Sequence, residues 1–236
     1  MPPPPLLTVS ALTKRFGAAE SAVLEGLELT LHAGEYLAIM GESGAGKSTL
    51  LNLIAGLDRA EAGRIRLEGV ELDTLDDDAR SRLRRSHLGF VFQAFHVLPY
   101  LTVLQNVTLP LELLGVARPA RQRRAHQWLE RCGIDALATR YPRELSGGEL
   151  QRTAIARALV HEPRLVLADE PTGNLDAHAA AQILQLLSGQ VHAAGAGAIL
   201  ITHSLAAARS ADRILRLEGG RLIHGVPEAS LAAERG

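Results

Sequence analysis

The pattern of hydrophobic and polar positions predicts that strands and helices alternate along much of this chain. Period-two alternation, weak in the first case, predicts strands at residues 6–12, 23–31 and 63–69. Short apolar runs predict further strands at residues 36–40, 87–92, 164–168 and 198–202. A turn-like segment at 13–17 separates the first two strands, and a glycine pair at 219–220 predicts a hairpin near the end of the chain.

Helical periodicity follows several of these strands. An apolar stripe that includes Leu50 and Ile54 predicts a helix directly after the strand at 36–40, and another helix runs from Ser146 until Pro163 breaks it. Further helices are predicted at residues 76–85, 119–137, 177–187 and 204–211. Strands that alternate with helices imply right-handed crossovers and a parallel sheet, while the three alternating strands imply a mostly antiparallel sheet beside it.

The chain is predicted to fold as one α/β domain over residues 6–236. Residues 6–93 and 162–224 form a core with a parallel sheet and an antiparallel β lobe, and residues 94–161 form a mainly helical insertion. The first five residues, MPPPP, form a short disordered tail of extended character, and residues 225–236 form a C-terminal tail.

A glycine-rich turn lies between the strand at 36–40 and the helix that follows it. Gly41, Gly44 and Gly46 lack a Cβ atom, so the backbone can adopt positive φ and bring its N–H groups close to an anion. The start of the helix adds unpaired N–H groups and the positive end of its dipole. Lys47 supplies a mobile charge for phosphates, and the Ser48 hydroxyl suits a Mg²⁺ ion that bridges them. The alternative, a turn that only connects strand to helix, requires all these features to coincide.

Two adjacent acids, Asp169 and Glu170, end the buried strand at 164–168. Ligands collect at the carboxyl ends of strands in open α/β sheets. Neighbouring side chains on a strand point to opposite sides, so one carboxylate can serve Mg²⁺ while the other addresses a water molecule beyond the phosphate. Because Pro171 and Thr172 follow, helix capping is the alternative role for this pair.

A second anion-binding helix start is predicted at Ser146, with Gly147 and Gly148 behind it. Ser146 suits an N-cap whose hydroxyl can also donate to a phosphate. Taken alone, a plain capping motif would be the better explanation of these residues. The motif gains a functional meaning because the same chain carries the phosphate loop and the acid pair.

Composition narrows the class of protein. The 236 residues carry a formal net charge of -1, 22% charged residues and 3% aromatic residues, which gives no electrostatic attraction to nucleic acid and few base-stacking platforms. Trp128, Leu129 and the single cysteine, Cys132, are expected in the core rather than in a site, and a reducing compartment fits. The basic run at 121–124 is expected to be a solvated face.

Two long stretches, residues 86–111 and 177–208, contain no Asp, Glu, Lys or Arg, which is one requirement of a membrane span. Both contain amide, imidazole and either proline or glycine residues, so neither offers about 20 consecutive apolar positions. The N-terminus also lacks the basic and apolar regions of a signal peptide. We therefore expect the polypeptide to stay in the cytoplasm.

Together these residues resemble the ATP-binding cassette ATPases over almost the whole chain, from about residue 6 to 223. GESGAGKS at 41–48 resembles the Walker A loop, LSGGE at 145–149 the family signature, and LVLADE at 165–170 the Walker B strand with its catalytic glutamate. GNLD at 173–176 resembles the D-loop, Gln93 the Q-loop glutamine and His203 the switch histidine. The resemblance implies a P-loop NTPase core with an antiparallel lobe and an inserted helical subdomain.

The resemblance also implies a set of site residues. The catalytic residues are Glu170, His203 and Gln93, and the Mg²⁺ ligands are Ser48, Gln93 and Asp169. The nucleotide-binding residues are Phe16, Gly41, Glu42, Ser43, Gly44, Ala45, Gly46, Lys47, Ser48, Thr49, Ser146, Gly147, Gly148, Glu149 and Asp176. Phe16 occupies the place of an aromatic that stacks on adenine, with loop packing as its alternative. Gln93 and His203, taken alone, would be strand-end residues with structural bonds.

Three positions depart from common family usage: Glu149 where Gln is frequent, Ala45 where Ser is frequent, and Ser204 where Asp often follows the histidine. None of them removes a group that the mechanism requires. In that mechanism, two subunits pack head to tail and sandwich two ATP molecules. Each γ-phosphate is held by Lys47 of one chain and by the 146–148 segment of the other, and Mg-dependent hydrolysis opens the dimer.

The resemblance further implies a membrane partner. Residues 88–113 are similar to the branch that serves lipoprotein release, macrolide or antimicrobial-peptide efflux and cell-division complexes, whose permeases have few spans and a large extracytoplasmic domain. The ATPase is then peripheral, at the cytoplasmic face of the inner or plasma membrane, and Phe95, Val97, Leu98 and Tyr100 are candidates for the permease-binding groove. The alternatives are a soluble cassette ATPase acting in DNA repair or translation, and a nucleotide-binding regulator without turnover.

Overall fold

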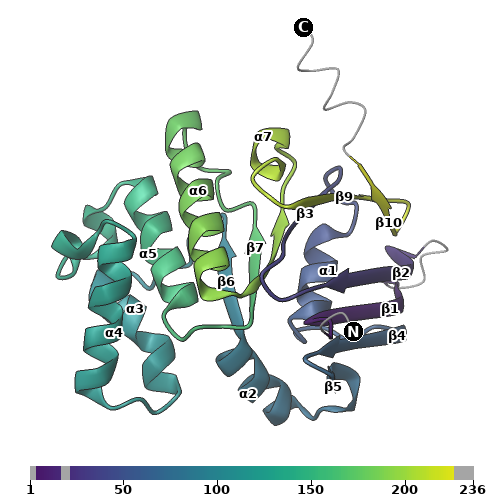
Figure 1. Ribbon diagram of the computed structural model, residues 1–236, viewed down its shortest axis with the longest axis horizontal. Helices are drawn as coiled ribbons and strands as arrows, with labels where there is room; N and C mark the ends of the chain where they lie inside the picture. The colour runs from purple at the N-terminus through teal and green to yellow at the C-terminus, as the bar shows by residue number, and fades with distance from the viewer. Residues whose placement is uncertain (1–3, 17–21, 226–236) are drawn as a thin grey trace, which may run out of the picture.

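The architecture rests on a six-stranded sheet in a computed structural model that describes residues 4–16 and 22–225 (Figure 1). The sheet has the order β10-β9-β3-β8-β7-β6. Its strands are β3 Tyr36–Met40, β6 Leu88–Phe92, β7 Leu165–Asp169, β8 Gly197–Ile201, β9 Arg213–Glu218 and β10 Arg221–His224. All pairs from β9 to β6 are parallel, and only β10 pairs antiparallel, through the hairpin with β9. The predicted parallel core and hairpin are therefore confirmed.

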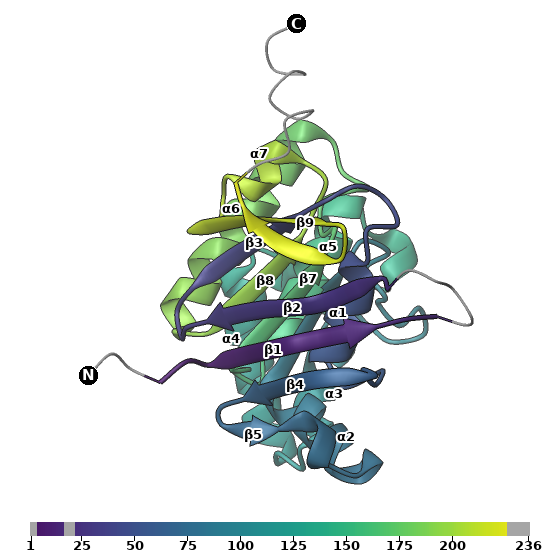
Figure 2. The same ribbon diagram turned by 90° about the vertical axis from the view of Figure 1, so that its right-hand side faces the viewer.

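A second sheet of four antiparallel strands lies beside the first (Figure 2). Its strands are β1 Leu7–Lys14, β2 Leu24–Leu31, β4 Ala62–Leu67 and β5 Val70–Glu71, in the order β2-β1-β4-β5. The predicted turn at 13–17 is wrong at its start, because β1 continues through Lys14. The Lys14 ammonium anchors that end of the strand on Asp58, at 3.0 Å. Gly17 lies outside the described residues.

Seven α-helices complete the described part of the chain. They are α1 Lys47–Ile54, α2 Asp77–His87, α3 Val103–Leu113, α4 Arg118–Arg131, α5 Gly147–Leu159, α6 Ala177–Ala194 and α7 Leu205–Ala208. Three short 3-10 turns lie at Leu72–Thr74, Asp135–Leu137 and Pro142–Glu144. Helices α3, α4 and α5 gather at one end of the molecule, away from the antiparallel sheet (Figure 1).

Several helix boundaries differ from those predicted. Helix α6 continues to Ala194 instead of 187 and ends where Gly195 adopts φ 63°. Helix α4 stops at Arg131, before Gly133 adopts φ 69°, and α7 is a single turn of four residues. Helix α3 was not predicted at all, because Pro110 lies inside it. Its start is secured by a capping box, in which Thr102 accepts from the Gln105 N–H and Gln105 accepts from the Thr102 N–H.

Strand alternation divides the core into two apolar clusters, one on each face of the large sheet. Even-numbered residues of β3 and β7, such as Ala38 and Val166, pack with the helices α3 to α7. Odd-numbered residues, such as Ile39 and Leu167, pack with α1 and the antiparallel sheet. Because side chains alternate along β7, this division sets the face of the sheet toward which a residue that continues the strand points.

The predicted core of α4 is confirmed, but its basic run is not simply a solvated face. Trp128 and Cys132 are buried, and burial raises the pKa of the Cys132 thiol to about 12. Arg121 pairs with Glu112 at 3.3 Å, and Arg124 pairs with Glu162 at 3.3 Å. These bonds hold α4 against α3 and against the end of α5. Within residues 4–16 and 22–225, no helix is both long enough and apolar enough to cross a membrane.

Candidate active site

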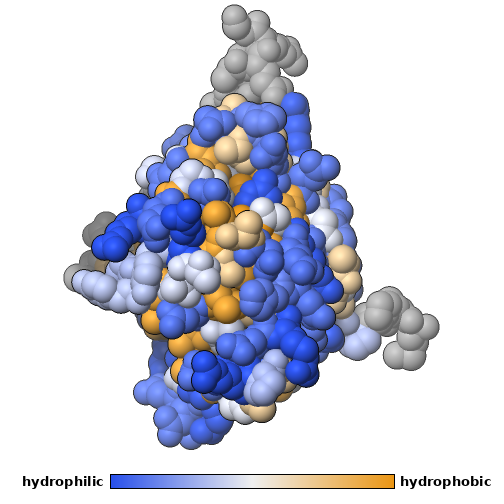
Figure 3. Space-filling model, turned by 90° about the vertical axis from the view of Figure 1, so that its left-hand side faces the viewer, coloured by the Kyte–Doolittle hydropathy of each residue, from blue (hydrophilic) through white to orange (hydrophobic). Residues whose placement is uncertain are grey.

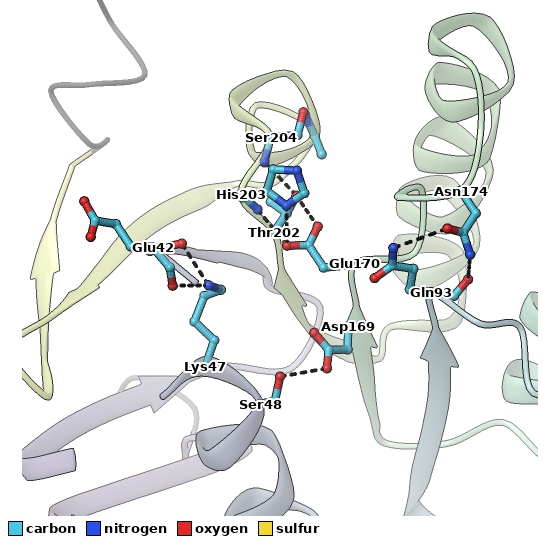
Figure 4. Close-up of polar contacts among 12 residues, drawn as sticks. Glu42, Lys47, Ser48, Gln93, Asp169, Glu170, Asn174, Thr202, His203 and Ser204 are labelled. Atoms are coloured by element: carbon cyan, nitrogen blue, oxygen red, sulfur yellow. Dashed lines mark hydrogen bonds and ion pairs between the residues drawn. The ribbon is translucent and has the colours of Figure 1, made fainter. Parts of the chain in front are cut away.

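The glycine-rich loop between β3 and α1 leads into a helix start that no side chain caps. Gly46, the N-cap of α1, adopts φ 97° and makes no side-chain capping bond, so the first N–H groups of α1 have no side-chain partner there. A Cβ atom on Gly46 would lie 2.8 Å from Val23 Cγ1, so this position requires glycine for space as well as for its dihedral angle. The Lys47 ammonium folds over the loop and donates to the Gly41 and Glu42 carbonyls at 2.8 and 2.7 Å (Figure 4).

Asp169 is directed toward α1 because it continues the odd-numbered face of β7. Its Oδ2 accepts a hydrogen bond from Ser48 Oγ at 3.1 Å (Figure 4). Burial raises the pKa of Asp169; the neighbouring Glu170 raises it further, while the Ser48 hydroxyl and Lys47 act in the opposite direction. Burial disfavours the ionised form of this carboxylate, so a nearby cation would stabilise that form.

Glu170 turns away from β7 because its backbone is left-handed, with φ 47°. Its carboxylate meets the residues that follow β8. Oε1 accepts from the His203 backbone N–H at 2.9 Å and lies 2.7 Å from His203 Nδ1, and Oε2 accepts from Thr202 Oγ1 at 3.2 Å. Three bonds thus fix this carboxylate at the edge of the cleft, as Figure 4 shows.

Gln93, the first residue after β6, is bound to the loop that follows β7. Its Nε2 donates to Asn174 Oδ1 at 3.3 Å, and Asn174 Nδ2 donates to the Gln93 carbonyl at 2.9 Å (Figure 4). Strands β6 and β7 are parallel neighbours with Phe92 opposite Asp169, so both loops leave the same edge of the sheet. Gln93, after β6, and the acid pair Asp169 and Glu170, at the end of β7, therefore lie at the same edge of the sheet.

A cleft of about 720 Å³ collects most of the predicted site residues. The predicted residues that line the cleft are Phe16, Ser43, Gly44, Gly46, Lys47, Ser48, Thr49, Gln93, Asp169, Glu170 and His203. The sequence reasoning did not assign the other lining residues: Val23, Phe92, Ala94 and His96. They carry no motif signal, because only the packing of strand ends against the glycine loop places them there. Gly41, Glu42 and Ala45 line a separate hollow on the β9 side of the loop.

Phe16 lies at the cleft with 52% of its surface exposed. The Lys14 ammonium is 5.1 Å from the centre of its ring. The ring therefore has an open side at the cleft and a cationic contact, which fits a stacking surface for a flat, electron-rich group. The adenine-stacking role stays a prediction.

The predicted residues of the signature and D-loop segments do not line this cleft. Ser146 caps α5: its hydroxyl accepts from the Glu149 N–H at 3.4 Å, and Glu149 Oε2 accepts from the Ser146 N–H at 2.7 Å and from its hydroxyl at 2.8 Å. The Ser146 N–H and hydroxyl lower the pKa of Glu149. Gly147 and Gly148 begin the same helix. Asp176 caps α6 by accepting from the Ala179 and His178 N–H groups, which lower its pKa.

The donor set at the inner end of the cleft fits Mg²⁺. Ser48, Asp169 and Gln93 offer hydroxyl, carboxylate and amide oxygens, which are the ligands that a hard cation takes. In the described residues, no cluster of three or more His, Cys, Asp or Glu side chains is arranged to hold a metal. Mg²⁺ typically binds through one or two protein ligands plus the phosphates of a nucleotide.

Comparison with known proteins identifies the family. The ABC transporter family profile matches residues 24–173, which is more than half of the chain. The chain belongs to the ABC transporter family. As an ABC-type ATPase, it binds and hydrolyses ATP.

Named relatives of this ABC transporter chain include the lipoprotein-releasing system ATP-binding protein LolD of Pseudomonas syringae pv. tomato. That protein is 50% identical over 207 residues, which cover 88% of this chain and 91% of the relative. The macrolide export ATP-binding/permease protein MacB of Shigella flexneri is 41% identical over 94% of this chain, which spans only 35% of MacB. The ABC chain is thus an ATPase subunit of the branch that contains LolD and MacB.

Solved structures show the same fold. The dimeric, post-hydrolysis structure of the ATP-binding cassette MJ0796 bound to ADP and Pi has a TM-score of 0.81 and 37% sequence identity, and the match covers 92% of this chain and 96% of that one. A second dimeric structure of the same ABC transporter cassette also gives a TM-score of 0.81, at 38% identity.

Proposed function

We propose that this ATPase works as a homodimer that closes on ATP and drives a membrane permease. The observation that carries the proposal is that two features suited to a phosphate lie apart in one chain. The cleft holds Lys47, Glu170 and His203, while the Ser146 helix start lies outside it. The capping box uses the Ser146 and Glu149 N–H groups, which leaves those of Gly147 and Gly148 at this helix start for a phosphate, and the phosphate that they meet is supplied by a second copy.

The cleft residues divide the work of hydrolysis by their positions. Lys47 exchanges its two carbonyl partners for phosphate oxygens, which bind the ammonium more strongly because they carry charge. The Glu170 carboxylate is fixed by Thr202 and His203, so it can accept a proton from an attacking water molecule as a general base. Ser48, Asp169 and Gln93 would hold Mg²⁺, which supplies charge neutralisation for the β- and γ-phosphates.

An apolar groove of about 530 Å³ supports the permease part of the proposal. Its apolar lining includes Leu57, Leu88, Phe90, Phe92, Leu98, Leu109, Pro110 and Leu113. Of the four residues proposed from the sequence, Leu98 lines the groove, and Tyr100 is 90% exposed. The end of the molecule that carries α3 to α5 also presents a band of apolar residues bordered by hydrophilic ones (Figure 3). Such a groove suits an amphipathic helix of a partner.

The names of the relatives support the proposed cargo and the permease partner. LolD is named for lipoprotein release and MacB for macrolide export, and MacB joins an ATP-binding part to a permease in one chain. We infer a permease with few spans and a large extracytoplasmic domain, moving lipoproteins or macrolide- or peptide-like molecules. The ATPase is then held at the cytoplasmic face of the inner membrane by that permease.

The test is a Glu170→Gln variant with and without Mg-ATP. Removing the base is expected to lower kcat by about 10²- to 10⁴-fold while leaving ATP binding intact. ATP then persists, and light scattering after gel filtration is expected to give twice the mass only when Mg-ATP is present. Thr202→Val, which removes one of the three bonds to Glu170, serves as the control and keeps measurable turnover. Hydrolysis by Glu170→Gln at the parent rate, or a strictly monomeric variant in Mg-ATP, would contradict the proposal.

A further inference from the structure

Asn174 and Gln93 form a two-point contact that no part of the proposed mechanism uses. The Gln93 side chain donates to Asn174 Oδ1 at 3.3 Å, and the Asn174 side chain donates back to the Gln93 carbonyl at 2.9 Å. The two residues are 81 positions apart and join the loops after β6 and β7. In Figure 4, the Gln93 amide nitrogen points to Asn174, and its oxygen points to the side of Glu170 and Asp169.

The direction of the Gln93 amide follows from the chemistry of this contact. A backbone carbonyl can only accept, so the Asn174 group that meets the Gln93 carbonyl must be its NH₂. The Asn174 oxygen is thereby turned to the Gln93 side chain, where it requires a donor. The Gln93 NH₂ group is the donor available, which leaves the Gln93 Oε1 atom for the cleft.

Gly173 makes room for this arrangement. A Cβ atom at position 173 would lie 2.7 Å from Gln93 Nε2 and 2.9 Å from its Cδ. These distances are closer than non-bonded carbon and nitrogen atoms approach, so any larger residue would displace the Gln93 side chain. Gly173 and Asn174 therefore act on the same amide by two different means, one by leaving space and one by hydrogen bonding.

We propose that Asn174 is a positioning residue that turns the Gln93 side-chain oxygen toward the divalent cation at the Ser48–Asp169 end of the cleft. The inference rests on the proposed role of Gln93 as a Mg²⁺ ligand. Magnesium takes oxygen ligands and does not take an amide NH₂ group, so a Gln93 side chain free to flip would present the wrong atom in part of the population. Residues that orient a metal ligand from behind typically change metal affinity by about 10- to 100-fold when removed.

The experiment measures cation binding directly, without turnover. Mn²⁺ is titrated into the full chain in the presence of a non-hydrolysable ATP analogue, and free Mn²⁺ is followed by its electron paramagnetic resonance signal. Asn174→Leu keeps the size of the side chain and removes its hydrogen bonds, and we expect the Kd for Mn²⁺ to rise about 10- to 100-fold. Gly173→Ala, which keeps Asn174, is expected to raise the Kd in the same direction.

Three comparisons decide the result. Binding of the analogue in EDTA should stay within about twofold of the parent, and Gln185→Leu, at an exposed amide on α6, should leave the Kd for Mn²⁺ unchanged. Asn174→Leu should add nothing in a Gln93→Ala background, because both changes act through one amide. Parent-like Mn²⁺ affinity in Asn174→Leu, or full additivity with Gln93→Ala, would overturn the positioning role of Asn174 and leave the ligand role of Gln93 standing. An unchanged Kd in Gln93→Ala would overturn the proposed ligand role of Gln93 itself.

Discussion

We expect Lys47 to exchange its hydrogen-bond partners when a nucleotide binds. Its ammonium is held by two neutral carbonyls of its own loop, Gly41 and Glu42. Hydrogen bonds between two charged groups are stronger than those to neutral carbonyls, so phosphate oxygens can displace these partners. The loop thus keeps the lysine in place beside the cleft before ATP arrives.

Replacement of Lys47 by alanine is expected to weaken ATP binding by about 10- to 100-fold, because it removes one charge-assisted hydrogen bond to phosphate. Isothermal titration of ATP in Mg²⁺ measures the change. Arg123→Ala is the matched control, because it removes an exposed cation from α4, a helix that does not line the cleft. This variant should bind ATP as the parent does. An unchanged Kd in Lys47→Ala would remove the phosphate role from this residue.

Asp169 links the cleft to the pH dependence of stability. Burial raises its pKa above the ordinary 3.8, so the folded chain holds this proton more tightly than the unfolded chain does. A raised carboxyl pKa means that the folded state is favoured at low pH, and that this advantage is lost as pH rises through the folded pKa. The ionised Asp169 therefore lowers the free energy of unfolding at neutral pH in the absence of a cation.

Asp169→Asn is expected to unfold at a higher temperature than the parent at pH 7.5 in EDTA. The difference should shrink as the pH falls through the raised pKa of the folded state and then below 3.8, where the parent carboxyl becomes protonated in both states. Scanning calorimetry across that pH range measures it, and the asparagine oxygen can still accept from Ser48. Lower stability of Asp169→Asn at pH 7.5 would show that the Ser48 bond to the carboxylate outweighs the cost of its burial.

Among the elements, the glycine loop depends on two glycines that differ in kind. Gly44 adopts φ 81° with open space around its Cβ position, whereas Gly46 adopts φ 97° and also faces Val23 at 2.8 Å. An alanine at Gly44 meets only backbone strain, which costs about 1–2 kcal/mol. An alanine at Gly46 meets the same strain and a steric conflict with the start of β2.

Gly46→Ala is therefore expected to destabilise the chain by more than Gly44→Ala does, and to weaken ATP binding further. Urea unfolding and ATP titration of both variants test this, with Gly44→Ala as the matched control. The backbone strain is common to both variants, whereas the steric conflict with Val23 belongs to Gly46→Ala alone; such overpacking typically costs about 1–3 kcal/mol, so the difference between the variants should be measurable. Equal effects of the two substitutions would show that the contact with Val23 is relieved at no cost.

The sequence was sufficient to predict the strands of the large sheet and most of the residues that line the cleft. The strands β3, β6, β7 and β8 are short apolar runs between polar loops and were predicted directly. Strand β9, in which Arg213 and Arg216 interrupt the apolar positions, was implied only by the final hairpin. Helix α3 was missed because proline is usually a helix breaker, while its capping box at Thr102 and Gln105 carried a signal that was not used. Helix α6 was predicted to end at 187, but it runs on through Gly189, which is exposed, to Ala194.

The parts of the site that sequence reasoning missed are contacts between distant loops. Thr202 meets Glu170 across 32 positions, and Asn174 meets Gln93 across 81. Neither residue has a chemistry that points to a role by itself, since threonine and asparagine are common at strand ends and turns. Their roles follow from the parallel pairing of β6, β7 and β8, which brings three loops to one edge of the sheet.

At the scale of the whole molecule, the proposed dimer predicts that two different inactive chains can restore one active site between them. Gly148 has open space at its Cβ position, and an acid in the first turn of a helix is favourable, so Gly148→Asp should fold normally. The same acid repels a phosphate presented by a second chain. Gly148→Asp and Lys47→Ala should each be nearly inactive when tested alone.

In a mixed dimer, the Gly148→Asp chain still offers Lys47, and the Lys47→Ala chain still offers an intact α5 start. One of the two sites then has both groups, so random pairing restores up to about a quarter of parent ATPase activity. If each chain instead used its own α5 start, every site in every dimer would lack one group, and mixing would restore nothing. The ATPase rate of the mixture, compared with a Gly148→Ala and Lys47→Ala mixture as control, therefore distinguishes a shared site from a self-contained one.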